Sequence, residues 1–215
     1  MDPPARDDAF AARRDRMVDS QILARGISDA RVLEAMRRVE RHRFVPLDQR
    51  ELAYGDYPIG IGFGQTISQP YIVAFMTEAL ALGPDSRVLE IGTGSAYQTA
   101  VLAEIARDVY SIEVVREHVA RATELLRALG YSNVHVRHGD GYTGWPDAAP
   151  FDGIIVTAAP DHVPPPLVEQ LRIGGRLVVP IGRGDQDLLV LTRTEDGLRE
   201  EERLAVRFVP LVRSP

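Results

Sequence analysis

Apolar residues in the N-terminal part of the chain recur at the spacing of α-helices. In residues 8–24 the apolar residues Phe10, Met17, Ile22 and Leu23 fall at helical spacing, and Gly26 ends this predicted helix. A second apolar face runs from Val32 to Val39, and Ser28 is its expected N-cap. The chain is therefore predicted to begin with a helical segment.

The stretch 41–64 breaks this periodicity. It is rich in proline and glycine, so we expect an irregular loop that lies over the main fold and carries functional residues. A helix is predicted from Pro70 to about Leu82, where Gly83 and Pro84 stop it.

From residue 87 onward, short apolar runs alternate with helical patterns. The runs predicted to be buried strands are 87–92, 109–114, 134–140, 151–159 and 175–182, and the helices expected between them are 98–107, 117–129 and 166–171, the last ended by Gly174-Gly175. Two further strands, 187–194 and 205–212, are separated only by a polar turn around Gly197. This order predicts an α/β fold with a doubly wound, mostly parallel seven-stranded sheet and an antiparallel pair at one edge. We divide the chain into N-terminal helices with their loop, 1–85, packed on a core, 86–215, as one structural domain.

Composition narrows the class of protein. The 215 residues are 45% hydrophobic, which suits one globular domain with a sizeable core. The net charge of −6 argues against general nucleic-acid binding, because phosphate contacts require a basic surface. The absence of cysteine excludes disulfides, thiolate metal sites and cysteine nucleophiles, and the five histidines show no metal-ligand spacing. No apolar run approaches the ~18–20 residues of a membrane span. We therefore expect a cytoplasmic protein with no metal and no nucleic-acid or membrane partner. We also expect a monomer, although the composition does not bear on oligomeric state.

The sharpest local signal is VLEIGTGSAYQTAVLA at 88–103. Its predicted strand ends in Gly92-Thr93-Gly94 and passes directly into a helix, where a parallel sheet binds ligands and glycines let them approach the backbone. A dinucleotide fingerprint requires glycine or another small residue where Tyr97 stands. Glu90 would repel a pyrophosphate but tolerates a cationic ligand. These features favour S-adenosylmethionine, which carries a sulfonium and an ammonium group.

Two other strand ends carry acidic residues. Glu113 ends the second predicted strand and could accept hydrogen bonds from the ribose hydroxyls of any nucleoside cofactor. Asp140-Gly141 follows the third, where the carboxylate could accept a hydrogen bond from the adenine amine; a turn-forming Asp-Gly is the alternative. Together with the glycines, these positions outline sites for the amino-acid tail, the ribose and the adenine.

From about Met17 to Val212 the chain resembles the protein-L-isoaspartate O-methyltransferases. The most specific motif is GQTISQPYIVAFM at 64–76, and the other motifs follow in the family's order: MVDSQILARGI, RVLEAMRRVERHRFVP, YGDYPIGIG, the glycine motif above, HGDGYTGWP, FDGIIVTAA, LRIGGRLVVPIG and FVPLV. The resemblance implies a Rossmann-like class I methyltransferase fold with helices added in front. It implies S-adenosylmethionine as methyl donor, with S-adenosylhomocysteine as product. As acceptor it implies the free carboxyl of L-isoaspartyl residues in damaged proteins and peptides, whose methylation initiates repair.

The resemblance also implies roles for individual residues. Ser68 matches the family's active-site serine. The candidate cofactor-binding residues, from the resemblance and the strand-end positions together, are Pro70, Tyr71, Ile72, Val73, Glu90, Gly92, Thr93, Gly94, Ala96, Glu113, Val114, Asp140 and Gly141. The candidate substrate-binding residues are Thr66, Ile67, Leu211 and Val212, the last two in a segment that the family uses to line its peptide channel; an ordinary strand is the alternative. Ala96 departs from the family, which usually has a third glycine there.

A carboxylate acceptor requires little chemistry from the protein. Its ordinary pKa near 4 leaves it ionised at pH 7, so no general base is needed, and the sequence shows no Ser-His-Asp spacing. The hydroxyl of Ser68, just before Pro70, could donate a hydrogen bond to that carboxylate; an N-cap serine is the plainer interpretation.

Other functions stay open from the residues alone. The same chemistry could act on an ordinary aspartate of one dedicated precursor peptide. A dinucleotide-dependent oxidoreductase is disfavoured by Tyr97, and a non-catalytic binding module by the presence of Ser68 and the acidic residues.

Overall fold

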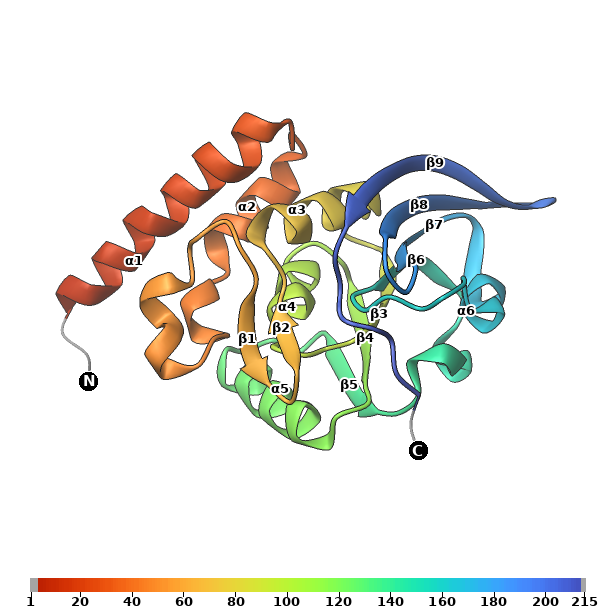
Figure 1. The fold of residues 1–215 in the computed structure, drawn as a ribbon. Coiled ribbons are helices and arrows are strands. Elements are labelled where there is room, and N and C mark those ends of the chain that lie inside the picture. The colour runs from red at the N-terminus through yellow and green to blue at the C-terminus, as the bar shows by residue number, and fades with distance from the viewer. Residues whose placement is uncertain (1–3, 214–215) are drawn as a thin grey trace.

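A computed structural model describes residues 4–213, and their side chains from residue 9 on. Helix α1 (Pro4–Met17) continues through a π-helical turn (Val18–Ile22) and a 3-10 turn (Leu23–Arg25) to Gly26, whose φ of 96° ends it. Helix α2 (Ala30–Arg38) follows, so the predicted N-terminal helices are confirmed (Figure 1).

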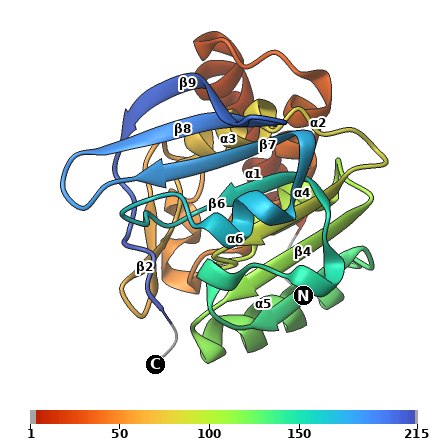
Figure 2. The ribbon, with the colours of Figure 1, turned by 90° about the vertical axis from the view of Figure 1, so that its right-hand side faces the viewer.

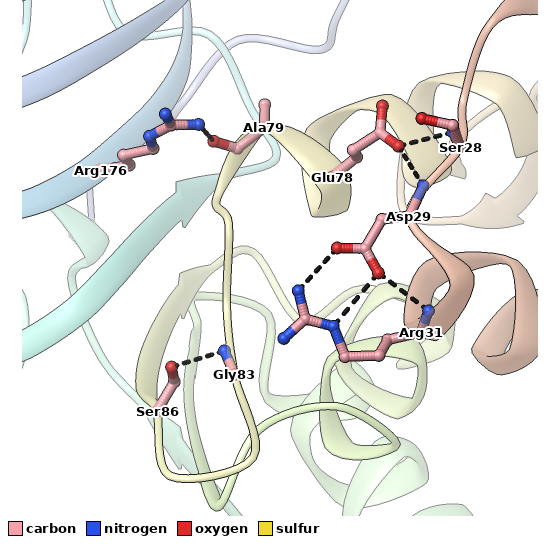
Figure 3. Close-up of polar contacts among 8 residues, drawn as sticks. All are labelled: Ser28, Asp29, Arg31, Glu78, Ala79, Gly83, Ser86 and Arg176. Atoms are coloured by element: carbon pink, nitrogen blue, oxygen red, sulfur yellow. Dashed lines mark hydrogen bonds and ion pairs between the residues drawn. The ribbon is translucent and has the colours of Figure 1, made fainter.

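The predicted N-cap of α2 is wrong by one residue. Asp29, not Ser28, caps the helix by accepting a hydrogen bond from the backbone N–H of Arg31. The backbone N–H groups of Ser28 and Asp29 instead donate to one carboxylate oxygen of Glu78, at 2.7 and 2.6 Å (Figure 3). Glu78 belongs to α3 (Pro70–Ala79), so this contact ties the start of α2 to the core, and α2 also packs on α3 and α4.

The stretch 41–64 is more regular than its composition suggests. It contains two 3-10 turns, η3 (Arg41–Arg43) and η4 (Leu47–Leu52), and continues into an antiparallel hairpin of β1 (Ile59–Gly62) and β2 (Gln65–Ile67). Gly62 and Gly64 adopt φ values of 94° and 71°, which a tight turn between the strands requires. The expectation of an irregular loop is therefore wrong for the hairpin, whose first strand alternates isoleucine with glycine.

The main sheet has seven strands in the order β5-β4-β3-β6-β7-β8-β9. The five parallel strands are β3 (Arg87–Ile91), β4 (Asp108–Glu113), β5 (Val134–His138), β6 (Phe151–Val156) and β7 (Leu171–Ile181). The antiparallel pair at one edge is β8 (Gln186–Thr194) and β9 (Gly197–Val206). The connecting helices are α4 (Tyr97–Ala103), α5 (Arg116–Ala128) and α6 (Pro165–Gln170), with 3-10 turns η5 (Gly141–Thr143) and η6 (Pro146–Ala148). The predicted doubly wound sheet with an antiparallel edge is confirmed.

Strand alternation divides the core into two layers. Val88 and Ile155 face a cluster built with the N-terminal helices, α3, α4 and α5, whereas Leu89 and Ile154 face a cluster built with α6 and η6. Figure 2 shows α6 in front of the sheet, on the side away from α1. Among residues 4–213, none of the helices combines the length and the apolar character that a bilayer crossing requires.

Two predicted boundaries at the C-terminal side are wrong. The last strand is 197–206 rather than 205–212, and residues 207–213 form an extended segment outside the sheet. This segment forms an isolated bridge between Pro210 and Ala159, and the backbone of Phe208 is hydrogen-bonded to the side chain of Gln186 in β8. β9 is an edge strand with mostly exposed side chains, so its sequence lacks an apolar pattern. Gly174-Gly175 does not end a helix but lies inside β7, where Gly174 adopts a φ of 79°.

Candidate functional site

A pocket lies at the carboxyl ends of β3, β4 and β6, the edge at which open parallel sheets bind ligands. We call it the inner pocket; its lining comes mainly from residues 65–68, 91–95, 112–114, 157–158 and 209–212. An adjoining outer groove runs between residues of the β1–β2 region and residues 205–209, and it shares Thr66, Ser68, Thr157 and Val209 with the inner pocket. Figure 1 shows the chain after β9 descending beside the hairpin. The two segments therefore flank one continuous cleft.

The glycine loop after β3 forms the floor of the inner pocket. Gly92 and Gly94 have φ values of 97° and 49°, and both line the pocket. A Cβ atom on Gly92 would collide with the hydroxyl of Thr157, which donates hydrogen bonds to the carbonyls of Ile91 and Gly92 at 3.0 and 2.8 Å. Glycine is thus required here both for its backbone conformation and for close packing against β6.

Glu113, at the end of β4, lines the pocket next to that loop and is 5% exposed. One carboxylate oxygen accepts from the backbone N–H of Gly94 and the other from that of Val115, both at 2.8 Å. Each oxygen keeps a further lone pair for a ligand donor. The carboxylate therefore fixes the glycine loop and can still receive hydroxyl groups.

Glu90 lies beneath the pocket and does not line it. Alternation along β3 turns its side chain to the α4 face, where Thr99 and Ser111 donate hydrogen bonds to one carboxylate oxygen at 2.5 and 2.6 Å. Burial raises the pKa of this carboxyl to about 8, although the two hydrogen bonds act in the opposite direction. Thr93, in the glycine loop, is 2.5 Å from the Ser111 hydroxyl, so Glu90 supports the loop from below.

Asp140 also lies outside the lining residues. It caps η5 by accepting from the backbone N–H of Tyr142 at 2.9 Å, and it pairs with Arg213 at 3.5 Å. Its neighbour Gly141 does line the pocket, and a Cβ atom there would collide with Ile91. The turn thus brings the backbone, rather than the carboxylate, of this predicted site to the pocket.

Ser68 lies where the inner pocket and the outer groove meet and lines both. The N-cap of α3 is Gln69, with Pro70 at the first helical position, so Ser68 is not the N-cap residue. Its carbonyl accepts a hydrogen bond at 2.7 Å from Arg41, whose guanidinium also donates to the carbonyl of Ala53 at 2.7 Å. This anchors the segment that carries Ser68 from the side away from the cleft.

The chemistry of the lining suits a nucleoside with positively charged groups. Among the described lining residues of the inner pocket, Glu113 is the only charged side chain, and none is basic. A pyrophosphate would meet no cationic partner there, whereas ribose hydroxyls and an ammonium or sulfonium group would meet a carboxylate. Ile91, Ile112 and Leu211 offer an apolar surface for a flat ring. Within residues 4–213, no group of three or more His, Cys, Asp or Glu side chains is arranged to hold a metal ion.

Comparison with known proteins decides the family. The model of the protein-L-isoaspartate(D-aspartate) O-methyltransferase family matches residues 12–214. This chain belongs to that family. The resemblance stated from the sequence is therefore confirmed.

Individual relatives agree over nearly the whole chain. A protein-L-isoaspartate O-methyltransferase of Picosynechococcus sp. is 57% identical over 212 residues, 97% of this chain and 96% of the relative. The enzyme of that name from Gloeobacter violaceus is 55% identical over 199 residues, 92% of this chain and 97% of the relative. Among solved structures, a Plasmodium falciparum protein described by the same activity, in complex with S-adenosyl-L-homocysteine, has a TM-score of 0.80 at 28% identity and covers 93% of this chain and 98% of its own. Another structure of that name has a TM-score of 0.83 at 31% identity over 92% of this chain, which spans 65% of the other's length.

The remaining candidate site residues from the sequence divide into three groups, according to whether they line the inner pocket, the outer groove or neither. Besides Ser68 and the residues above, the inner pocket is lined by Thr66, Ile67, Val73, Thr93, Val114, Leu211 and Val212. Ile72 lines the outer groove instead. Pro70, Tyr71 and Ala96 line neither: the Tyr71 ring packs against Arg25, whose guanidinium carbon lies 3.4 Å from the ring centroid, and Ala96 is a fully buried N-cap of α4.

Several lining residues are absent from the sequence-based candidates. They are Gln65, Ile91, Ser95, Tyr97, Gln98, Ile112, Thr157, Ala158, Val209 and Pro210. Thr157 and Ala158 follow β6, the strand beside β3, so the strand-end rule applied to FDGIIVTAA would have found them. Gln98 lies inside a helix, where no local signal marks it.

Proposed function

We propose that this chain transfers the methyl group of S-adenosylmethionine to the free carboxyl of L-isoaspartyl residues in damaged proteins and peptides, which initiates their repair. Family membership supports the reaction. The observation that carries the residue assignments is that Ser68 lines both compartments of the cleft, one suited to a nucleoside and the other open to an extended peptide.

The inner pocket would hold the cofactor through three strand ends. Glu113 would accept hydrogen bonds from the ribose, the backbone of Gly92–Gly94 would lie against the amino-acid tail, and Gly141 with Leu211 would lie against the adenine. When bound, S-adenosylmethionine supplies a methyl group on a positively charged sulfur, and its carbon–sulfur bond breaks with the electron pair staying on sulfur. Glu90 acts by holding the loop, because its carboxyl is bound to Thr99 and Ser111.

The acceptor carboxylate would be oriented rather than activated. Its ordinary pKa near 4 keeps it ionised, so no proton has to be removed before its oxygen forms the bond to the methyl carbon. The hydroxyl of Ser68 would donate a hydrogen bond to it, and Thr66 lies beside it in the same shared wall. Correct placement of two reactants is by itself a large part of the rate of such a reaction.

The outer groove would receive the peptide on either side of the isoaspartyl residue. The residues that it shares with the inner pocket include Val209 of the C-terminal segment. We infer that the chain acts as a monomer. We infer a cytoplasmic enzyme whose partners are isoaspartyl proteins rather than nucleic acids.

The test compares an isoaspartyl peptide with its aspartyl twin and counts methyl groups transferred. Only the isoaspartyl peptide should be methylated; equal methylation of the twin would favour an enzyme for an ordinary aspartate. Ser68→Ala removes a hydrogen bond to a charged group, which is worth ~1.5–3 kcal/mol, so turnover should fall roughly 10- to 100-fold while S-adenosylhomocysteine affinity stays near wild type. Ser132→Ala, at an exposed position after α5, is the matched control and should leave turnover unchanged. Normal turnover of Ser68→Ala would remove this residue from the mechanism.

A further inference from the structure

Arg41 is a fully buried cation without an acidic partner. Its side chain is 0% exposed, and no carboxylate oxygen of the described residues lies within 4.0 Å of its guanidinium. It donates to the carbonyls of Ala53 and Ser68, and its guanidinium carbon lies 4.8 Å from the ring centroid of Tyr97. The remaining amino group, Nη1, is buried with no hydrogen-bond partner among the described residues.

The charge of Arg41 is only partly compensated. Burial lowers the pKa of the guanidinium to about 10, so it remains protonated at neutral pH. Removing a charge from water without a counter-ion is costly, and two carbonyl dipoles and the face of Tyr97 offset only part of that cost. An anion brought near this position would therefore be attracted.

In the proposed function, the acceptor carboxylate is such an anion, and it would lie at Ser68. Arg41 reaches Ser68 from behind, through the carbonyl of that residue, while Ser68 faces the cleft. The other charges are unfavourable or weak: Glu113 in the inner pocket repels a carboxylate, and Arg207 in the outer groove is exposed, so its field is screened by solvent. Arg41 is thus the one buried positive charge among the described residues around Ser68.

We propose that Arg41 is a positioning residue that makes the cleft prefer the carboxylate form of the acceptor over its neutral, methylated form. The inference rests on the proposed function. In methyl transfer a carboxylate oxygen gains a bond to carbon and the acceptor loses its negative charge, with no proton transferred. Arg41 therefore strengthens substrate binding and not product binding, so the ester leaves readily.

The test measures binding of two peptides in the presence of S-adenosylhomocysteine: an isoaspartyl peptide, and the same peptide with its free carboxyl replaced by a carboxamide. The amide is neutral, like the ester, and it does not react. Wild type should bind the carboxylate at least about ten-fold more tightly. Arg41→Gln should raise the Kd of the carboxylate peptide about ten-fold and leave that of the amide unchanged. In turnover, KM should rise by about the same factor, with kcat changing much less.

Two variants separate charge from packing. Arg41→Lys, measured at pH 6, where a buried ammonium is more readily protonated and the acceptor carboxylate is still ionised, should retain most of the preference for the carboxylate. Arg43→Gln changes the net charge equally at an exposed position at the end of η3 and should behave as wild type. Titration with S-adenosylhomocysteine alone checks that each variant is folded.

Three results would overturn the role of Arg41. The first is that Arg41→Gln weakens binding of the carboxylate peptide and of the amide peptide equally. The second is that Arg41→Gln and Arg43→Gln change the Kd values by the same factor. The third is that wild type binds the two peptides with the same affinity. If Arg41→Gln does not fold, Arg41→Lys at pH 6 decides: a retained preference supports the proposal, and a lost preference at that pH contradicts it. Failure of the proposed function is distinguishable, because wild type would then not methylate the isoaspartyl peptide at all.

Discussion

Replacing Glu90 by glutamine should change how the stability of the protein depends on pH. The carboxyl is 0% exposed beneath the glycine loop, and one of its oxygens, Oε1, has no partner among the described residues. Burial raises its pKa from 4.5 to about 8. The folded protein therefore holds this proton over a pH range in which the unfolded chain has released it.

The sign of the effect follows from proton binding. Between about pH 4.5 and pH 8 the folded state binds more protons at Glu90 than the unfolded state, so its contribution to stability falls as the pH rises. At about 1.36 kcal/mol per pH unit, the gap between the two pKa values corresponds to roughly 5 kcal/mol as an upper limit. A glutamine side chain cannot titrate, so Glu90→Gln should gain stability relative to wild type across this window.

Urea unfolding at a series of pH values measures the difference between the two proteins. The amide oxygen of glutamine can still accept the hydrogen bonds from Thr99 and Ser111. The amide group, however, buries two N–H donors where the protonated carboxyl has one O–H, and the additional donor lowers stability by ~1–3 kcal/mol at every pH. The slope of the difference, not its absolute value, is therefore the test. Glu117→Gln, at an exposed position of α5, makes the same change in charge and should show little slope. A difference between Glu90→Gln and wild type that is constant with pH would refute the reasoning.

Three further substitutions test the pocket and the glycine loop that leads into α4. Glu113→Gln puts an amide N–H against a backbone N–H and removes a charged acceptor, so the Kd for S-adenosylhomocysteine should rise roughly 10- to 100-fold, and an unchanged calorimetric titration would exclude Glu113 from the site. Gly92→Ala should lower Tm because its Cβ would collide with Thr157 at a φ of 97°, whereas Gly60→Ala, with open space around it, should not; equal Tm values would contradict the packing argument. Ala96→Gly should change the urea midpoint little. Glycine relieves the strain of the left-handed φ of 69°, which stabilises the protein by ~1–2 kcal/mol. The loss of a buried methyl group costs ~0.8 kcal/mol and the greater backbone entropy of unfolded glycine ~0.5–1 kcal/mol, so the two effects nearly cancel. A large loss of stability there would mean that the methyl group is tightly packed.

The sequence could predict the sheet and the glycine loop because both depend on local patterns. Buried parallel strands are apolar runs, and a strand that ends in Gly92-Thr93-Gly94 before a helix needs no distant information. The same logic failed for β9, because an edge strand with mostly exposed side chains carries no apolar alternation. It also failed for the β1–β2 hairpin, because the glycines of β1 are more typical of loops than of strands.

Site residues were harder to predict, because the residue type and its position in a strand leave open what covers the side chain. Glu90 and Glu113 lie at the ends of neighbouring strands and are both acidic, yet α4 covers one and the other lines the pocket. Asp140 was predicted as a site residue because it follows the end of a strand. In the structure its carboxylate instead accepts a hydrogen bond from the backbone of Tyr142 in its own turn and pairs with Arg213.

The sequence by itself determined the alternation of strands and helices and the glycine turn that approaches a ligand, since each is encoded within a few consecutive residues. It also determined the family, because the family's motifs follow one another in order along nearly the whole chain. Only the tertiary structure decided which side chains meet in the cleft. Ser68 and Arg41 are 27 positions apart, and their contact at 2.7 Å depends on how the N-terminal segment packs against the sheet. Burial and charge compensation are properties of such long-range contacts, so no local pattern could have marked Arg41.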